Sequence, residues 1–462
     1  MEFSMTNIDQ AIRELKDFLG ERVSTAKSKL SLYGQNETYF EEMPPDAVVF
    51  PKTTDEVAKI VTICAQNNCP VVPWGVGTSL EGHSLAIRGG VTIDMCYMNK
   101  VLAVKQEDLL VVVQPGLTRK KLNNELRATG LFFPVDPGAD ATLGGMAATR
   151  ASGTTAVRYG TMRENVIAME VVLADGRTIR TGTQAKKSSA GYDLTKLFIG
   201  SEGTLGIITE LTLILHGQPE AVAAGVCEFE TVDSAVGAVI SAIQMGIPMA
   251  RIELIDQISI RAINAYSKLN YPEKPHLFME FHGSNLGVKD QSITMEQIIK
   301  EFGGGEFKWS VKPEERSRLW AARHEAYYAT KAFFPGKLGM STDVCVPISE
   351  LANAITDTQA DLEQFGVTGA IVGHVGDGNF HTLMFSDRHD SEDLERNKMI
   401  AHRMAERALA VGGTVTGEHG IGLGKMKYMA QEHGEALPLM VELKRTFDPQ
   451  NIMNPGKMVN LN

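Results

Sequence analysis

The 462-residue sequence lacks an excess of basic residues, a long apolar run and a dense set of cysteines. Asp and Glu outnumber Lys and Arg by 56 to 45, which leaves a net charge of −11 at pH 7. This balance argues against a broad nucleic-acid footprint, because phosphate binding needs a basic surface. It also disfavours electrostatic adsorption to anionic lipid, although a local basic patch would still permit peripheral contact with a membrane.

No stretch reaches 18 uninterrupted apolar residues, so the sequence contains no recognisable transmembrane helix. The first 20 residues lack the basic start, apolar run and cleavage site of a signal peptide, and their acidic residues argue against a mitochondrial presequence. The five cysteines are odd in number, scattered and set in apolar surroundings. They are typical of reduced core thiols in a cytosolic protein, with a redox role as the alternative.

The two commonest nucleotide-binding motifs are also absent. The glycine-rich segment 75–82 does not have the spacing of the dinucleotide fingerprint, and His419 and Met426 occupy positions that a P-loop reserves for Gly and Ser/Thr. What the sequence does contain is three separate glycine-rich turns, at 75–82, 138–153 and 200–206. Because glycine lets the backbone approach a ligand closely and form anion-binding turns, these segments favour a large anionic cofactor over a plain surface loop.

The rhythm of hydrophobic residues changes near residues 217–219, which predicts a domain boundary there. We expect a first domain at 1–219, a second at 220–418 and a C-terminal segment at 419–462 that folds back. In the second domain, strand-like runs alternate with helical patterns. This alternation predicts an α+β domain built on a mostly antiparallel sheet with helices on one face.

The sharpest local signal is GHVGDGNFH at 373–381, where a turn cluster separates two strand-like runs. If the hairpin pairs residue 376 with 379, His374 lies opposite His381 on the same face. Two imidazoles placed in this way can share one divalent ion, whereas a single histidine would more often be an ordinary core or surface residue. This arrangement predicts a metal site, with a purely structural hairpin as the alternative.

Two further segments carry groups suited to the same site. Glu418 and His419 lie between glycines, and two histidines plus one carboxylate form a common catalytic metal set. Because adjacent residues in an extended strand cannot both face one ion, we expect Glu418 to be the ligand and His419 to be free for acid–base work. Arg323 lies among apolar residues of a helix predicted at 314–332, where its guanidinium needs a partner such as a substrate carboxylate.

Six segments together resemble the FAD-linked dehydrogenases of the vanillyl-alcohol oxidase type, which share the p-cresol methylhydroxylase (PCMH) fold. They are PWGVGTSLEG (73–82), DPGADATLGGMAATRASGTTAVRYG (136–160), GSEGTLGIIT (200–209), GHVGDGNFH (373–381), GEHGIGLGK (417–425) and FDPQNIMNPGK (447–457). Within this family the sequence is most similar to the flavin-dependent D-2-hydroxyacid dehydrogenases, the D-lactate dehydrogenases among them. The resemblance implies an α+β fold with a two-subdomain PCMH-type FAD-binding domain, an antiparallel-sheet substrate (cap) domain and a C-terminal return to the flavin.

The resemblance also implies roles for individual residues. Non-covalently bound FAD would contact Trp74, Gly75, Val76, Gly77, Thr78, Ser79, Pro137, Gly138, Thr142, Gly145, Ser152, Gly153, Gly206, Ile207 and Asn454. A divalent ion, zinc or manganese, would be held by His374, His381 and Glu418. In this scheme Arg323 anchors the substrate carboxylate, and His419 takes the hydroxyl proton while the C2 hydride passes to the flavin.

Two positions favour a substrate with a single carboxylate. D-2-hydroxyglutarate dehydrogenases, which are similar to this sequence, carry a Lys and an Asn where this chain has Ser341 and Leu383, and those groups suit a second carboxylate. Oxidation of D-lactate is therefore favoured. The alternatives are the FAD subunit of glycolate oxidase, a D-2-hydroxyglutarate dehydrogenase, and a regulatory flavin- or metal-binding protein without turnover. His83, beside the first glycine-rich loop, leaves covalent attachment of the flavin open.

The resemblance implies an electron acceptor as partner, with quinone, cytochrome and electron-transfer flavoprotein all open. No nucleic-acid partner is expected. The organellar presequence usual in eukaryotic members is not recognisable, so we expect a cytoplasmic bacterial enzyme, with peripheral contact at the inner face of the membrane left open.

Overall fold

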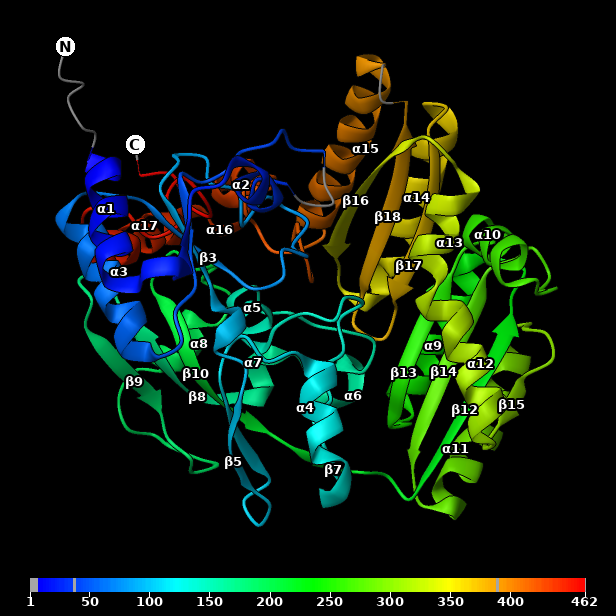
Figure 1. Ribbon diagram of the computed structural model, residues 1–462. Helices are drawn as coiled ribbons and strands as arrows, with labels where there is room; N and C mark the ends of the chain where they lie inside the picture. Colours follow the sequence, from blue (N-terminus) through cyan, green and yellow to red (C-terminus); the bar gives the residue numbers. More distant parts are fainter. Residues whose placement is uncertain (1–6, 36–38, 388–389, 462) are drawn as a thin grey trace. The chain divides into compact units, whose positions relative to one another are not determined.

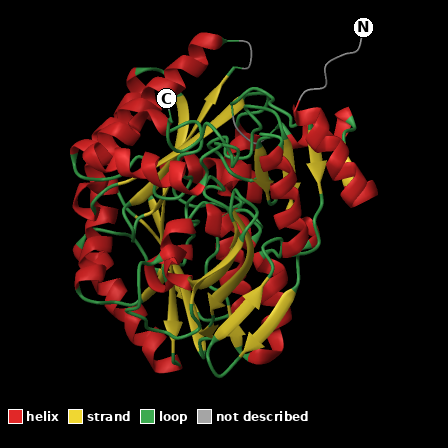
Figure 2. Ribbon diagram, turned by 90° about the vertical axis from the view of Figure 1, so that its left-hand side faces the viewer, coloured by secondary structure: helices red, strands yellow, loops and turns green. Residues whose placement is uncertain are grey.

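The computed structural model describes residues 7–35, 39–387 and 390–461 (Figure 1). The chain divides into two compact units. Unit 1 comprises residues 1–152, 161–217 and 419–462, and unit 2 comprises residues 153–160 and 218–418. The sequence-based division did not separate residues 153–160 from their neighbours. Helices and largely antiparallel sheets alternate along the chain, which confirms the predicted α+β class (Figure 2).

The first sheet of unit 1 has four strands, of which the last three in spatial order are parallel and the first is antiparallel to its neighbour. In spatial order they are β1 (Val23–Ser24), β2 (Ala47–Val49), β4 (Val91–Asp94) and β3 (Val71–Trp74). Their apolar side chains share a core with α1 (Asn7–Leu19) and α3 (Thr54–Gln66). The side chain of Thr53 caps α3 by accepting a hydrogen bond from the Glu56 backbone.

The second sheet of unit 1 is antiparallel and has five strands. In order they are β5 (Val101–Lys105), β6 (Leu110–Val113), β10 (Ile207–Ile214), β8 (Val166–Val172) and β9 (Thr178–Gly182), with the separate pair β11 (His216–Gly217) and β7 (Leu131–Phe132). The helices of this part are α4 (Arg119–Glu125), α5 (Leu143–Ala148), α7 (Met162–Asn165) and α8 (Leu194–Phe198), whereas α2 (Lys27–Tyr33) packs against the four-stranded sheet through Tyr33 and Val48. Strands β8 and β9 form an antiparallel hairpin around the turn at 174–176.

The C-terminal segment returns to unit 1 and completes its first sheet. It carries α16 (Met429–His433) and α17 (Leu437–Phe447). Beyond α17, Met453 forms a parallel bridge with Val71 of β3. The Lys444 ammonium is buried against Asp448 at 2.5 Å and also donates to the Met453 carbonyl, so this return is fixed by both backbone and charge.

Unit 2 is built on one antiparallel sheet of seven strands (Figure 1). In order they are β15 (Lys308–Ser310), β12 (Ala221–Glu228), β14 (His276–Gly283), β13 (Met249–Ile255), β17 (Thr368–His374), β18 (Asn379–Ser386) and β16 (Leu338–Cys345). The helices are α6 (Ala156–Tyr159), α9 (Val232–Gln244), α10 (Gln257–Ser267), α11 (Asn285–Glu301), α12 (Pro313–His324), α13 (Ala326–Phe333), α14 (Leu351–Gln364) and α15 (Ser391–Ala410). Four of these helices contact one another in the order α11, α9, α14 and α15.

A second group of helices in unit 2 shares a core with the sheet residues Phe278 and Val372. This group is α10, α12 and α13, which contribute Ile260, Trp320 and Ala326 to that core. Because side chains alternate between the two faces of a strand, Phe278 and Val372 share their face with residues 280 and 374. The helices α10, α12 and α13 therefore pack on the sheet face from which His374 projects.

The hairpin between β17 and β18 has a different register from the predicted one. His374 pairs with Asn379, and His381 pairs with Val372, so the two histidines are diagonal neighbours rather than direct partners. The loop is longer than the prediction assumed, because the last pair is His374 with Asn379. Within it Gly378 adopts φ +78°, and a Cβ there would overlap the Val346 carbonyl. Diagonal neighbours still share a face of the sheet, so the two imidazoles remain on the same side.

Candidate functional site

Three side chains of unit 2 converge in the way that a metal site requires. One carboxylate oxygen of Glu418, Oε2, lies 3.3 Å from Nε2 of His374 and 3.2 Å from Nε2 of His381. The two imidazole rings stand nearly perpendicular, with their centroids 5.1 Å apart. The three residues can each offer one ligand atom within 4.8 Å of the others. This brings together the three predicted ligands from β17, β18 and the segment after α15.

The donor set also passes a test of chemical fit for a divalent ion. Oε1 of Glu418 is buried and makes no hydrogen bond with any residue that the structure describes. A buried polar atom without a partner is costly unless a further group satisfies it. Two imidazole nitrogens and a carboxylate with an unused oxygen suit zinc and other divalent ions, and leave positions open for a substrate.

Glu253 on β13 lies behind this set and was missed by the sequence analysis. Its side chain is fully buried, and its Oε1 accepts a hydrogen bond from Nδ1 of His374 at 2.7 Å. A carboxylate in this position holds a proton on Nδ1 and leaves the Nε2 lone pair facing the site. The local sequence signal was an acidic residue inside the apolar strand 249–255. The pairing of this strand with β17 brings Glu253 next to His374.

Arg323 on α12 has a partner within the protein, which the sequence analysis did not identify. Its Nε and Nη2 both donate to Oε2 of Glu253, at 3.0 and 2.5 Å. Glu253 therefore joins Arg323 to His374 through its two oxygens. The remaining nitrogen of the guanidinium, Nη1, makes no hydrogen bond within the described part of the chain, so one edge is left for an anion.

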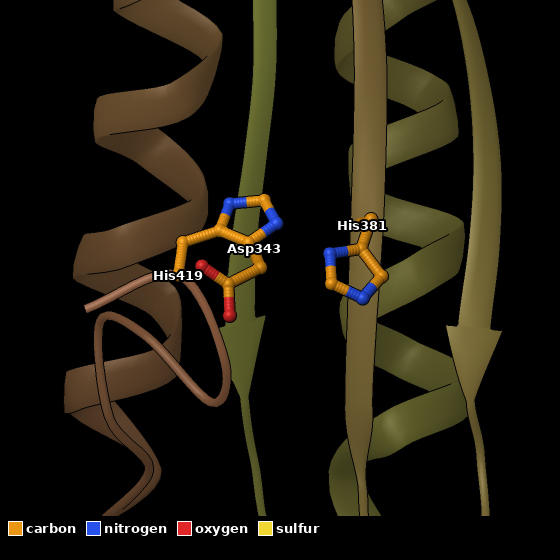
Figure 3. Close-up of side chains that lie close together, drawn as sticks. All are labelled: Asp343, His381 and His419. Carbon is orange, nitrogen blue, oxygen red and sulfur yellow. The ribbon is translucent and has the colours of Figure 1, made fainter. Parts of the chain in front are cut away.

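Asp343 on β16 holds the segment that carries Glu418. Its Oδ2 accepts from the backbone N–H groups of Gly417 and Glu418, at 2.7 and 2.8 Å, and Thr416 donates its hydroxyl to Oδ1. Asp343 pairs directly with His381 in the β16–β18 ladder, so both side chains project from one face of the sheet (Figure 3). Figure 3 also labels His419, which follows Glu418 in the chain and is partly exposed.

The ionisation states in the site are strongly coupled. Burial alone would raise the pKa of Glu418, but the charges and hydrogen bonds of His374 and His381 hold that pKa well below its usual value. Burial alone would lower the pKa of His374, but Glu253 and Glu418 raise it well above the usual value. The site thus has an anionic character that favours a positive charge between its side chains, and a metal ion that binds there displaces a proton.

Two of the candidate cofactor residues, Gly75 and Gly145, lie close to a third, Thr142, the residue before α5. A Cβ on Gly75 would overlap the Thr142 hydroxyl, and a Cβ on Gly145 would come within 3.0 Å of it. Only glycine permits this close approach of the two loops. The residues Trp74 to Ser79 and Pro137 to Gly138 lie largely at the surface of unit 1 in segments without regular structure beyond β3, as a ligand-binding loop requires.

The other candidate cofactor residues differ in their burial and contacts. Gly206 and Ile207 are buried, with the Ile207 side chain in the core beneath β3 and β4, which leaves only its backbone to contact a ligand. Ser152 is partly exposed in unit 1, whereas Gly153 is buried in unit 2. The Asn454 amide donates to the carbonyls of His83 and Glu202, so its side chain joins loops of unit 1.

Glu202 is the centre of that junction and was also missed by the sequence analysis. Its carboxylate accepts from the backbone N–H groups of Ile421 and Gly422, at 2.7 and 2.8 Å, and lies 3.2 Å from Nε2 of His83. Burial alone would raise the pKa of Glu202, but His83 and the two N–H groups lower it. Glu202 therefore connects the loop at 200–206 with the first glycine-rich loop and with the returning C-terminal segment.

Two family models match the chain, one in each half. The FAD binding domain model matches residues 45–182, and the model for the C-terminal domain of FAD linked oxidases matches residues 218–458. The chain belongs to the FAD-linked oxidase family. FAD is its cofactor and its activity is that of an oxidoreductase, which confirms the family and the cofactor predicted from the sequence.

Three relatives match nearly the whole of this chain. A probable mitochondrial D-lactate dehydrogenase of Danio rerio is 49% identical over 98% of this chain and 92% of its own length. A mitochondrial D-lactate dehydrogenase (cytochrome) of Arabidopsis thaliana is 44% identical over 97% of this chain and 80% of its own. The glycolate oxidase subunit GlcD of Bacillus subtilis is 36% identical over 92% of each chain.

Among solved structures, p-cresol methylhydroxylase with substrate bound matches the fold. The TM-score is 0.81 at 19% identity, covering 99% of this chain and 97% of that chain. This likeness confirms the predicted PCMH-type fold.

The comparison contradicts the predicted cellular location. Both of the D-lactate dehydrogenases above are named as mitochondrial proteins, so the expectation of a cytoplasmic bacterial enzyme was wrong. The reasoning failed because it depended on recognising a presequence at the N-terminus. Separately, no described helix is long and apolar enough to cross a membrane.

Proposed function

We propose that this chain oxidises a small D-2-hydroxy monocarboxylic acid, in the first place D-lactate, to the 2-oxo acid. The convergence of His374, His381 and Glu418 carries the proposal, because this set offers an open divalent-metal position beside an arginine suited to a carboxylate. The relatives named as D-lactate dehydrogenases support the same substrate. Bound FAD supplies the oxidant, since a flavin accepts two electrons from a carbon–hydrogen bond.

We propose zinc or manganese as the ion held by His374, His381 and Glu418. Such an ion, when bound, lowers the pKa of a coordinated hydroxyl group and so makes its proton easier to remove. Glu253 keeps Nε2 of His374 available as a ligand, and Asp343 fixes the backbone that presents Glu418.

Arg323 and His419 complete the proposed set. Arg323 holds the substrate carboxylate through the guanidinium edge that Glu253 leaves open, which fixes the orientation of a small acid. His419 accepts the hydroxyl proton, because an imidazole titrates close to neutral pH and can act as a general base. The assignment of these two roles rests on the family motif and on the chemistry of the side chains.

A decisive experiment is anaerobic mixing of the purified flavoprotein with D-lactate or L-lactate while the visible absorbance of oxidised flavin is followed. We expect bleaching by the D enantiomer only. His419→Ala should slow this reduction by about 10²- to 10⁴-fold, the usual contribution of a general base. His433→Ala, a partly exposed histidine of α16, is the matched control and should behave like wild type. Equal bleaching by both enantiomers would overturn the proposal.

The same experiment separates the main alternative. Glycolate oxidase is favoured if glycolate reduces the flavin faster than D-lactate does, and the relation to the GlcD subunit makes that comparison worthwhile. For reoxidation of the flavin we propose a cytochrome acceptor over a quinone or an electron-transfer flavoprotein, supported by the name of the Arabidopsis relative. Reduction of added cytochrome c by the enzyme and D-lactate, measured against a soluble quinone, tests this choice.

A further inference from the structure

Glu253 uses both of its carboxylate oxygens on groups of the proposed site. Oε1 accepts from Nδ1 of His374 at 2.7 Å, and Oε2 accepts from Nε and Nη2 of Arg323 at 3.0 and 2.5 Å. The side chain is fully buried on the central strand β13. It therefore has no place at the surface of the site and acts only through its two partners.

We propose that Glu253 is a positioning residue, whose single carboxylate fixes both the proton on His374 and the direction of the Arg323 guanidinium. The inference rests on the proposed function, because it concerns a metal ligand and the carboxylate anchor named there. Metal binding and recognition of the substrate carboxylate then both depend on Glu253, so that a substitution of Glu253 weakens both.

The effect on His374 follows from its two ring nitrogens. With a carboxylate at Nδ1, that nitrogen carries the proton, and Nε2 presents its lone pair toward Oε2 of Glu418 and the adjacent imidazole. Without an acceptor at Nδ1, the proton is free to occupy Nε2 instead. A protonated Nε2 cannot bind a metal ion, so the ligand is lost although the histidine is still in place.

The effect on Arg323 follows from the planar shape of its guanidinium. Two nitrogens on one edge are held by the same oxygen, which fixes the plane of the group in a side chain that is only 11% exposed. A fixed plane directs Nη1 at one place, and little entropy is then lost when a carboxylate binds there.

Unit 2 contains a second group in which a glutamate contacts a histidine and an arginine, and this group lies outside the proposed metal site. Glu280 on β14 accepts from Nε2 of His282 at 2.8 Å and lies 3.4 Å from Nη1 of Arg251. There the other ring nitrogen of His282 is occupied by the hydroxyl of Tyr159 at 2.7 Å. Both ring nitrogens of His282 are therefore hydrogen-bonded to other side chains. In His374, Nδ1 is used in this way, whereas Nε2 faces the proposed metal ligands. Glu280 is therefore a control for Glu253 that is matched in burial and chemistry.

The test compares E253Q with E280Q in the flavin-loaded enzyme. In E253Q the new carbonyl oxygen accepts from the charged Arg323, so the amide N–H points at Nδ1 of His374 and drives the proton to Nε2. We expect the affinity for Zn²⁺, titrated alone against a chromogenic chelator, to fall by about 10- to 100-fold, as is usual when the carboxylate behind a ligating histidine is lost. At saturating Zn²⁺, KM for D-lactate should also rise. E280Q should change neither value.

Flavin absorbance and melting temperature establish that both variants fold. If E253Q does not fold, E253D takes its place, because it keeps the charge but is one methylene too short to reach both partners, and the same loss of Zn²⁺ affinity is expected. Equal Zn²⁺ affinity in wild type and the Glu253 variant would overturn the inference alone. An equal loss in E280Q would overturn it too, since burial rather than position would be the cause. A wild-type enzyme that binds neither Zn²⁺ nor Mn²⁺ would instead overturn the proposed metal site itself.

Discussion

At the scale of single residues, Lys457 has an unusual environment. Its ammonium group is 1% exposed in unit 1 and donates to the carbonyl of Leu85 and to Oδ1 of Asn454. Burial lowers the pKa of Lys457 from about 10.5 to about 7, and the Glu202 carboxylate acts weakly in the opposite direction. A neutral amine can still donate both hydrogen bonds, so the folded chain favours the uncharged form.

This environment predicts a pH dependence of stability. Between about pH 7 and pH 10 the unfolded chain keeps the Lys457 proton and the folded chain releases it, so the free energy of unfolding should rise with pH by up to about 1.4 kcal/mol per unit from this group. Below pH 7 both states are protonated and the slope from this group vanishes. Lys457→Met should remove the rise, as measured by chemical denaturation from pH 6.5 to 9. Lys59→Met, at an exposed position of α3, should leave it unchanged. An unaltered slope in the Lys457 variant would contradict the assignment.

At the scale of secondary-structure elements, the strand pair β16–β18 organises one side of the proposed site. Ser341 pairs with Leu383, and Asp343 pairs with His381 two positions further along the same face. The proposed ligand His381 and its pair partner Asp343 therefore lie next to Ser341 and Leu383 on one face of the ladder, with the Thr342–Thr382 pair between them facing the other way.

The ladder makes a prediction about Asp343. Asp343→Ala removes the acceptor for the Gly417 and Glu418 N–H groups, so the Glu418 carboxylate is no longer held between the histidines. We expect Zn²⁺ affinity to fall by about 10- to 100-fold, the range found for groups that orient metal ligands. The control is Asp361→Ala on α14, another buried acid, whose partners are Arg403 and Arg407. Asp361→Ala should lower stability while leaving Zn²⁺ affinity at the wild-type value.

The same ladder makes a prediction about specificity. The double variant Ser341→Lys, Leu383→Asn places a cation and an amide opposite each other on the site face. We expect kcat/KM for D-2-hydroxyglutarate to rise relative to D-lactate by at least about tenfold, since one charge-assisted hydrogen bond contributes roughly 1.5–3 kcal/mol. Initial rates with both acids measure the ratio. An unchanged ratio, in a variant that still reduces its flavin with D-lactate, would show that these positions do not select the substrate.

The contrast between β17–β18 and β13 shows what the sequence can and cannot predict. The two histidines were found because they lie in one hairpin, where turn residues and strand runs are local signals. Even there the predicted register was off by two, because the turn residues alone do not determine which residues form the last pair before the loop. Glu253 was missed because it lies 121 residues from His374 along the chain. No local pattern states which strands become neighbours in a seven-stranded sheet, so a partner of that kind requires the three-dimensional structure.

At the scale of the whole molecule, the proposed metal ligands and the FAD binding domain belong to different units. His374, His381 and Glu418 are all in unit 2, whereas most of the FAD binding domain match at 45–182 lies in unit 1. Metal binding and flavin binding therefore depend on different sets of contacts. Each unit also has its own sheets and apolar core.

This separation predicts the result of removing the metal. Dialysis against a strong chelator should abolish reduction of the flavin by D-lactate while the flavin stays bound, because no proposed metal ligand belongs to unit 1. Absorbance of the protein fraction after gel filtration measures retained flavin, and added Zn²⁺ or Mn²⁺ should restore the reduction. Mg²⁺ is the control ion and should not, since it prefers oxygen ligands to imidazole. Loss of flavin together with the metal would contradict the independence of the two sets of contacts.

The parallel bridge between Val71 and Met453 has a consequence for biosynthesis. A ribosome makes β3 early, then all of residues 218–418, and only afterwards the segment that lies against β3. The nascent protein can thus finish its seven-stranded sheet while the flavin-binding part still waits for its final forty or so residues. A premature stop codon near the end of the message would therefore damage the portion of the protein that was translated first.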